Sequence, residues 1–464
     1  MLALSLGLLL QVATPVGTDS VMPVSFPDFG ARVQSFHPVA RTARASADAA
    51  EQDVRVARGS FDPTITASWD RKRFAGKTYY DEVAAELKIP TTLGVDVKVA
   101  LERSLGTNVN PQAFTPQGGL VTIGVSIPIG QRLLTDERRA ALQQARAVRE
   151  AVDGDRASAI NRLLLAAARD YARWYEAWRR EGIAREGMAL AAFRLDGVRR
   201  RYQTGEVPAI DTLEARLEVQ RREGQFIEAR QALVTARLVA SAYLWDEQLR
   251  PVELAPNAVP TLNGLSAAPV DSTALASWLD EALRVHPDLA RAGARLRALE
   301  AQQRLFGQQL IPLVGLDVAT LGSGDAPTGG ALEDNFKAGL NLSSPLLYLR
   351  ERGRLGGVNR RLDALRFDLA RARRDVSIAV RSAANDVGAV ERLIVLQRIT
   401  VVQARTLLAG EQRRFDNGES SLLIVNLRER LLLDEEVRLV QLEARQVGAR
   451  AELATALGRA DPLP

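Results

Sequence analysis

Side chains that could carry out catalysis or bind a metal are scarce in this sequence. The 464-residue chain has two histidines and no cysteine, which excludes disulfides, thiol catalysis, zinc-thiolate sites and a lipid anchor on an N-terminal cysteine. His37 and His286 each precede a proline where a helix is expected to begin, and this position favours a structural role over a metal site. No glycine-rich phosphate loop, nucleophile elbow or pair of carboxylates in a possible pocket is recognisable. The sequence therefore predicts no enzyme, no cofactor and no metal.

The most specific chemical signal is a turn motif that occurs twice. RRRYQTGEVPAI and QRRFDNGESSLLI both place an aromatic residue three positions before a glycine, with basic residues ahead of it and a glutamate directly after the glycine. Gly205 and Gly418 in these motifs would supply the positive φ of a tight turn between two helices. Beyond the first turn, Asp211 and Glu214 are three residues apart and fall on one helical face. The sequence therefore predicts ion pairs close to two tight turns as its main chemical feature.

The two motifs belong to an internal repeat that covers most of the chain. Helix, strands, very long helix, turn and helix follow one another in residues 28–248 and again in 274–460, with a proline-rich linker over 249–273. The His-Pro helix starts and the prolines that end the strand regions, Pro128 and Pro345, recur in the same order. The expected strand regions are about 64–129 and 313–345, and the expected tip turns are about 203–209 and 416–421.

The helices of this repeat are expected to be very long and only thinly apolar. Apolar residues alternate steps of four and three from Leu433 to Ala454 and from Leu362 to Ala383, which is a heptad seam with many alanines. The segment 131–202 has no internal proline and would be on the order of 100 Å long as a helix. Small seam residues let helices approach closely, but the polar remainder leaves no face broad enough for a globular core. The pattern therefore predicts coiled-coil rods that need partners.

The strand segments alternate between apolar and polar residues. In NFKAGLNLSS, for example, Ala338 and Leu340 fall on one face, and Lys337 and Asn341 fall on the other. Such strands fit either a soluble sandwich or a membrane β-barrel with a wet lumen. Since a few strands attached to long rods have no second sheet to cover them, the barrel is favoured.

The N-terminus and the charge distribution restrict the protein class and the expected partners further. Residues 1–20 are expected to be a secretory signal peptide, because the apolar stretch from Leu2 to Leu10 is too short to cross a bilayer. No other stretch approaches a transmembrane helix, so a membrane-spanning part would consist of strands. The net charge of +5 is spread along the helical segments, so nucleic acid is not an expected partner. The rival class is a soluble periplasmic coiled-coil scaffold or adaptor protein, against which the strand alternation and the signal-like N-terminus argue.

This plan resembles the TolC-type outer-membrane efflux and secretion channel family. The resemblance covers nearly the whole chain and rests on the duplication, the His-Pro helix starts, the strand-end prolines and the aromatic-x-x-Gly turns. It implies a mixed, mainly α fold in which the coiled-coil hairpins of a homotrimer form a periplasmic α-barrel. Four strands from each protomer would complete a 12-stranded antiparallel β-barrel in outer-membrane lipid. The first strand region is longer than this requires, and GVDVKVAL at 94–101 is a candidate for an extra extracellular hairpin.

The implied function is that of an exit duct in the outer membrane of a Gram-negative bacterium, extending into the periplasm. It would serve a tripartite efflux pump or a type I secretion system and passively conduct what an inner-membrane transporter exports. The tip turns would dock a periplasmic adaptor protein, although both glycines would also suit a turn with no other role. Carried over residue by residue, the docking positions are Gly205, Glu206 and Val207 in the first repeat and Gly418, Glu419 and Ser420 in the second.

The resemblance also implies a pore that closes at the tips. The second tip of the family often carries acidic residues about one turn after the glycine, whereas this sequence reads VNLR there and ends on Arg428. A link from Asp211 or Glu214 to Arg428 between neighbouring hairpins, with Tyr202 beside it, is therefore the candidate gate. The other interpretation is that these side chains are solvated surface charges.

Overall fold

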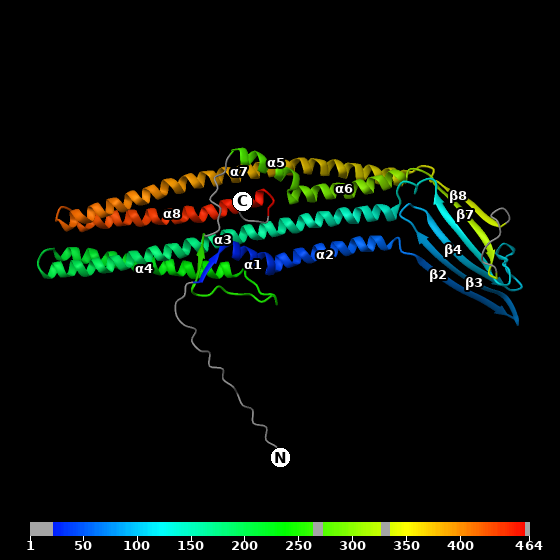
Figure 1. Cartoon of the computed structure of the whole chain (residues 1–464), viewed down its shortest axis with the longest axis horizontal. Coiled ribbons are helices and arrows are strands. Elements are labelled where there is room, and N and C mark those ends of the chain that lie inside the picture. The colour runs from blue at the N-terminus through cyan, green and yellow to red at the C-terminus, as the bar shows by residue number, and fades with distance from the viewer. Residues whose placement is uncertain (1–21, 263–271, 326–334, 460–464) are drawn as a thin grey trace, which may run out of the picture.

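The computed structural model describes residues 22–262, 272–325 and 335–459, so the expected signal peptide lies outside the described residues. Figure 1 shows a long bundle of helices with a β-sheet at one end and two helical turns at the other. This is the mixed, mainly α architecture that the sequence predicts.

The first repeat holds most of the strands. It comprises β1 (Met22–Ser25), α1 (Phe26–Phe36), α2 (Pro38–Gly59), β2 (Thr64–Phe74), β3 (Lys77–Pro90), β4 (Asp96–Leu105), a 3-10 turn (Pro111–Ala113), β5 (Leu120–Pro128), α3 (Glu137–Gln203) and α4 (Ala209–Ser241).

The linker contains one short strand, β6 (Ala258–Thr261). The second repeat then comprises α5 (Ser272–Val285), α6 (Pro287–Gln308), β7 (Leu313–Ser323), β8 (Phe336–Ser343), α7 (Leu349–Asp416) and α8 (Leu422–Ala456).

Two pairs of shorter helices pack against two very long ones. With 67 and 68 residues, α3 and α7 are each about 100 Å long. In the half of the bundle near the turns, the helices lie side by side in the order α4, α3, α8, α7. In the half near the sheet, the order is α2, α3, α6, α7. Along α8, the seam that the sequence predicts is buried at Val440, Ala444, Val447, Ala451 and Ala454, and its first two members, Leu433 and Val437, are half-buried.

The His-Pro pairs start helices, as their positions suggest. His37 is the N-cap of α2 and His286 is the N-cap of α6, and in each case the ring nitrogen Nδ1 accepts a hydrogen bond from the backbone N–H two residues on, at 3.2 Å. The proline that follows occupies the first helical position, where its missing N–H costs nothing. Both histidines therefore have a structural role in capping.

A two-stranded sheet at the middle of the helical bundle is hydrogen-bonded to the long helix α3. β1 and β6 pair in parallel, and the Tyr171 hydroxyl of α3 lies 2.7 Å from the carbonyl oxygens of Val24 and Thr261 on these two strands. Trp174 and Phe29 pack beside Tyr171, and all three side chains are fully buried. The aromatic residues in the middle of α3 thus hold the linker strand against the helices.

The sheet contains six antiparallel strands in the order β2, β3, β4, β5, β7, β8. The sheet therefore has two strands more than the four that the resemblance implies for each protomer of the barrel. GVDVKVAL, the candidate for an extra hairpin outside the membrane, forms most of β4 and pairs with β3 on one side and with β5 on the other. The additional hairpin is thus a part of the sheet.

Candidate functional site

The first tip turn has the geometry of a Schellman motif. Gly205 has φ +80°, the N–H of Gly205 donates to the carbonyl of Tyr202 at 3.0 Å, and the N–H of Glu206 donates to the carbonyl of Arg201 at 2.9 Å. These bonds satisfy the last carbonyls of α3. A residue with a Cβ would be strained at this φ, so the turn depends on glycine.

The second tip turn repeats this geometry. Gly418 has φ +78°, its N–H donates to the carbonyl of Phe415 at 3.0 Å, and the N–H of Glu419 donates to the carbonyl of Arg414 at 2.8 Å. The two motifs therefore produce the same local structure, because aromatic-x-x-Gly-Glu places glycine at the same position after the last helical turn.

The two turns lie side by side at one end of the molecule (Figure 1). The Arg201 guanidinium of the first turn lies 5.3 Å from the ring centroid of Phe415 in the second. Val207 packs with Phe415 on a small apolar cluster formed by Leu195, Val198, Ala215 and Leu422. Both hairpins therefore present their ends together as one surface.

The outer side of this surface is open. A Cβ placed on Gly205 or Gly418 would meet no atom within 4 Å, and the Glu206 and Glu419 side chains are exposed. Ser420 is half-buried, and its hydroxyl donates a hydrogen bond to Glu411. The backbone of both turns is thus accessible to another protein.

The candidate gate residues lie just behind the tips. Tyr202 is about half exposed, and Asp211, Glu214 and Arg428 are half-buried. Within one protomer the structure shows no ion pair from Arg428 to either carboxylate among the described residues. Glu214 instead accepts a hydrogen bond from the Asn426 amide, at 3.5 Å.

A buried charge cluster, which the sequence analysis does not predict, joins the two hairpins at this level. Glu429 of α8 is 2% exposed, and its carboxylate lies 2.5 Å from Arg194 of α3 and 3.7 Å from Arg222 of α4. Arg194 also donates to Asn426 at 2.9 Å, and Arg222 donates to Glu218 at 2.9 Å. The cluster thus ties three helices together about 14 Å from the end of α3.

One signal in the sequence marks this cluster. Val425, Glu429 and Leu432 are separated by steps of four and three, so a glutamate occupies a position in a heptad seam where an apolar residue is the rule. A charge at such a position is buried when the seam packs, and it then requires a partner of opposite charge. Which basic residues supply the partner depends on how the helices are arranged.

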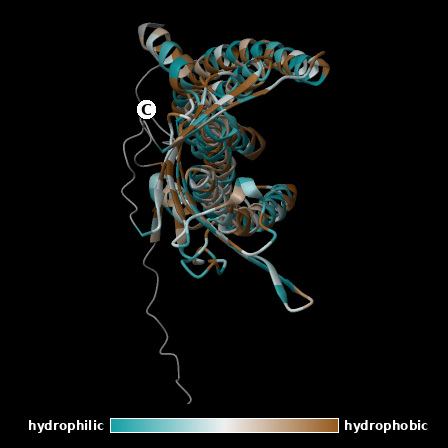
Figure 2. Cartoon of the chain, turned by 90° about the vertical axis from the view of Figure 1, so that its right-hand side faces the viewer, coloured by the Kyte–Doolittle hydropathy of each residue, from teal (hydrophilic) through white to brown (hydrophobic). Residues whose placement is uncertain are grey.

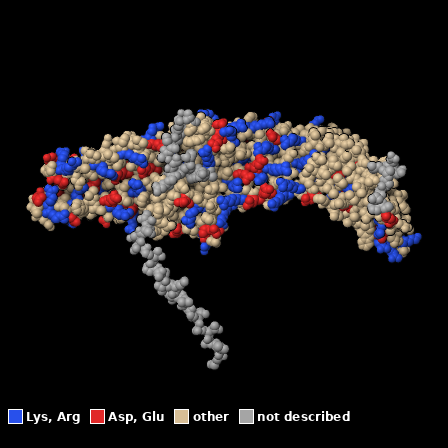
Figure 3. All heavy atoms as spheres, viewed as in Figure 1, with Lys and Arg blue, Asp and Glu red and all other residues tan. Residues whose placement is uncertain are grey.

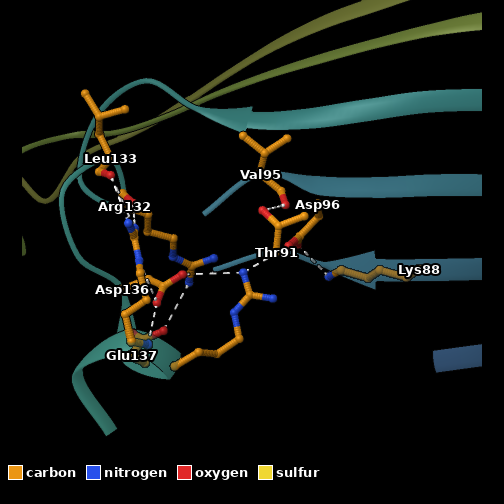
Figure 4. A network of polar contacts seen from close by, with 10 residues as sticks. Lys88, Thr91, Val95, Asp96, Arg132, Leu133, Asp136 and Glu137 are labelled. Atoms are coloured by element: carbon orange, nitrogen blue, oxygen red, sulfur yellow. Dashed lines mark hydrogen bonds and ion pairs between the residues drawn. The ribbon is translucent and has the colours of Figure 1, made fainter. Parts of the chain in front are cut away.

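A second polar network fastens the sheet to the helices at the other end (Figure 4). Asp136 caps α3 by accepting from the backbone N–H of Arg139 at 2.8 Å. Asp96 at the start of β4 accepts from Arg138 at 2.9 Å and pairs with Lys88 of β3 at 3.2 Å. The end of the sheet and the start of α3 are therefore held in one orientation.

The comparison with known protein families identifies the chain. The family model for outer membrane efflux proteins matches residues 37–239 and 278–459, which follow the two repeats. The chain belongs to the outer membrane efflux protein family. It is accordingly an outer-membrane exit duct that extends into the periplasm of a Gram-negative bacterium, and the soluble scaffold interpretation does not agree with this membership.

Solved outer-membrane channels have the same fold. The chain matches the channel OprN with a TM-score of 0.64 at 18% identity over 93% of this chain and 89% of that one. It matches CmeC of Campylobacter jejuni with a TM-score of 0.62 at 12% identity over 93% and 85% of the two chains. MtrE of Neisseria gonorrhoeae, in its open state, gives 0.62 at 14% identity over 94% and 89%. No curated protein gives a significant match in sequence.

Proposed function

We propose that this efflux protein works as a homotrimer whose hairpins close into a periplasmic α-barrel. The observation that supports the trimer is an exposed apolar stripe on each outer helix of the four-helix array near the tips. Because these stripes are on opposite edges, α7 of one protomer can pack on α4 of the next, and such head-to-tail contacts form a ring when the rotation closes. The stripe on α4 comprises Leu213, Leu217, Ile227, Val234 and Leu238, and the stripe on α7 comprises Val395, Ile399 and Val402.

The composition of α7 agrees with this interface. Within the part of the chain that the structure describes, α7 is the one helix that is long and apolar enough to cross a membrane. The expectation that only the N-terminus approaches such a composition is therefore wrong for α7. Most of this apolar stretch is exposed in one protomer, and packing on the α4 stripe of a second copy would remove it from water.

Cysteine pairs test the trimer directly, because the natural chain has no cysteine. Leu217→Cys combined with Val402→Cys or with Thr406→Cys should give disulfide-linked dimers and trimers in outer membranes on a non-reducing gel. Gln225→Cys, which is exposed on the side of α4 away from the stripe, is the control and should give monomers with the same partners. Equal cross-linking by Leu217→Cys and Gln225→Cys would contradict the interface.

The tips are the proposed docking surface for a periplasmic adaptor, which in turn would connect to an inner-membrane transporter. Two features support this role: both turns have the same backbone conformation, and both leave their glycines open to solvent. A trimer would present six such turns on one ring. The docking positions are Gly205, Glu206, Val207, Gly418, Glu419 and Ser420.

The same ring is the proposed gate. Since Arg428 has no carboxylate partner among the described residues of its own chain, a link to Asp211 or Glu214 would form between protomers in the closed trimer, with Tyr202 nearby. Arg428→Glu would replace attraction by repulsion, so conductance in planar bilayers should rise. Changing Asp211 and Glu214 to Arg in the same variant should restore the low conductance. An unchanged conductance for Arg428→Glu would place the gate elsewhere.

A further inference from the structure

All six strands share one predominantly apolar face. The pairing register carries apolar residues across the whole sheet, and the row is broken only by a threonine. The next row is apolar on all five strands that reach it. The first row is Ile65, Leu87, Val99, Ile123, Thr320 and Phe336, and the second is Ile89, Val97, Val125, Val318 and Ala338.

The opposite face is polar on the same strands. It carries Lys88 and Asp96, which pair at 3.2 Å, and Lys98 and Asp317, which pair at 3.7 Å. On the apolar face, charge returns in the row of Trp69, Val83 and Arg103 and in the row beyond it, where Arg71 pairs with Asp81 of β3 at 3.6 Å. Figure 2 shows hydrophobic residues recurring along these strands, and Figure 3 shows charges gathered at the far end of the sheet.

The separation of an apolar face from a polar face indicates whether the additional hairpin, to which β3 and β4 belong, lies in the membrane. A charged residue on a lipid-facing strand costs about 2–4 kcal/mol near the middle of the bilayer, so lipid contact keeps a face free of charge. A hairpin standing in water beyond the membrane has no such constraint. The apolar face of β3 and β4 is free of charge from Val83 to Ile89 and from Val97 to Leu101, in register with β5.

The sheet ends on two edge strands, β2 and β8, which can pair with further strands. β2 is exposed along all of its 11 residues, and β8 is exposed at all but one position. Because six strands alternate in direction, the two edges are antiparallel to each other. An unpaired edge cannot face lipid, and a second copy of this chain supplies an edge of the required direction.

We propose that β8 of each protomer pairs with β2 of the next, so that three copies of the six-stranded sheet close an 18-stranded barrel. This rests on the homotrimer proposed above. The diameter of a barrel grows roughly in proportion to strand number, so this one would be about 1.5 times as wide as a 12-stranded barrel, and barrels of this class leave an aqueous channel. The periplasmic tips, rather than the barrel, would then limit the size of the cargo.

Neighbouring cysteines on one strand test whether the additional hairpin lies in the membrane. Ala84 and Ala85 are adjacent on β3 and belong to the polar and the apolar face, respectively. In outer-membrane vesicles, a water-soluble maleimide should label Ala84→Cys and fail to label Ala85→Cys. A bimane attached at position 85 should be quenched by brominated lipids, whereas one attached at position 84 should not. Equal aqueous labelling of the two variants would place the hairpin in water and overturn the proposal.

A second experiment tests the closing contact. Ser68→Cys on β2 is combined in turn with Lys337→Cys, Gly339→Cys and Asn341→Cys, which share the polar face of β8. One of these registers should give a disulfide-linked trimer. If Ala100→Cys on β4 cross-links to β8 instead, β2 and β3 are outside the barrel and the barrel has 12 strands. The Leu217 cross-links on the tip helices report the trimer independently, so trimers that lack the β2–β8 link refute the barrel alone.

Discussion

Glu429 is the acidic centre of the buried cluster that joins the two hairpins, and its removal should destabilise the tip half of the molecule. Glu429→Gln keeps the size of the side chain and removes its charge. Arg194 and Arg222 would then remain buried with less compensation. Removing one partner of a buried ion pair typically costs about 3–5 kcal/mol.

The structure places the expected cost at the lower end of that range. Arg194 would keep its hydrogen bond to Asn426, and Arg222 would keep its bond to Glu218, both at 2.9 Å. A loss of about 3 kcal/mol corresponds to a change of about a hundredfold in the folding equilibrium. Urea unfolding of the detergent-solubilised protein, followed by helical circular dichroism, measures this loss as a lower midpoint.

Two further variants separate the charge effect from a general loss of packing. Glu223→Gln removes an exposed carboxylate on the neighbouring helix and should change the stability by no more than about 0.5 kcal/mol. Changing Glu429 to Leu together with Arg194 and Arg222 to Met removes all three charges and should restore most of the stability, since a buried pair is often replaceable by apolar residues. If Glu429→Gln unfolds at the same midpoint as Glu223→Gln, the cluster does not hold the hairpins together.

Three other changes probe the sheet, the tips and a helix cap. Leu340→Arg should lower the yield of assembled trimer at a cost of about 2–4 kcal/mol for a charge in lipid, while Asn341→Arg on the polar face should assemble like the parent; equal yields would refute the orientation of the sheet. Gly205→Trp or Gly418→Trp should abolish transport and cross-linking to the adaptor while trimers still reach the outer membrane, and normal transport would reject the docking role. Burial lowers the pKa of His286 below its ordinary value of 6.5, so the unfolded chain takes up the proton first. Stability should therefore fall as the pH decreases from about 6.5 through the lowered pKa; His286→Asn, which keeps a capping side chain, should remove this part of the pH dependence, and an unchanged pH profile would contradict it.

The sequence by itself determined the features that depend on local periodicity. The repeat, the heptad seams of the long helices and the alternation of the strands are all visible in the order of residues, because helices and strands impose fixed periods on buried side chains. The turns are equally local: aromatic-x-x-Gly-Glu yields a positive φ at Gly205 and again at Gly418. The fold class and the family membership follow from these patterns together.

Only the tertiary structure decided which segments become partners. The alternation of GVDVKVAL identifies a strand, but its place between β3 and β5 depends on pairing with residues distant in sequence. At the tips, Arg428 and Glu429 are adjacent in the chain, yet Glu429 points into the junction of α3, α4 and α8. Adjacent residues on a helix are rotated by about 100°, and the heptad steps place Glu429 in the seam. Which basic residues reach its carboxylate depends on how α3 and α4 pack against α8, and no local pattern specifies that packing.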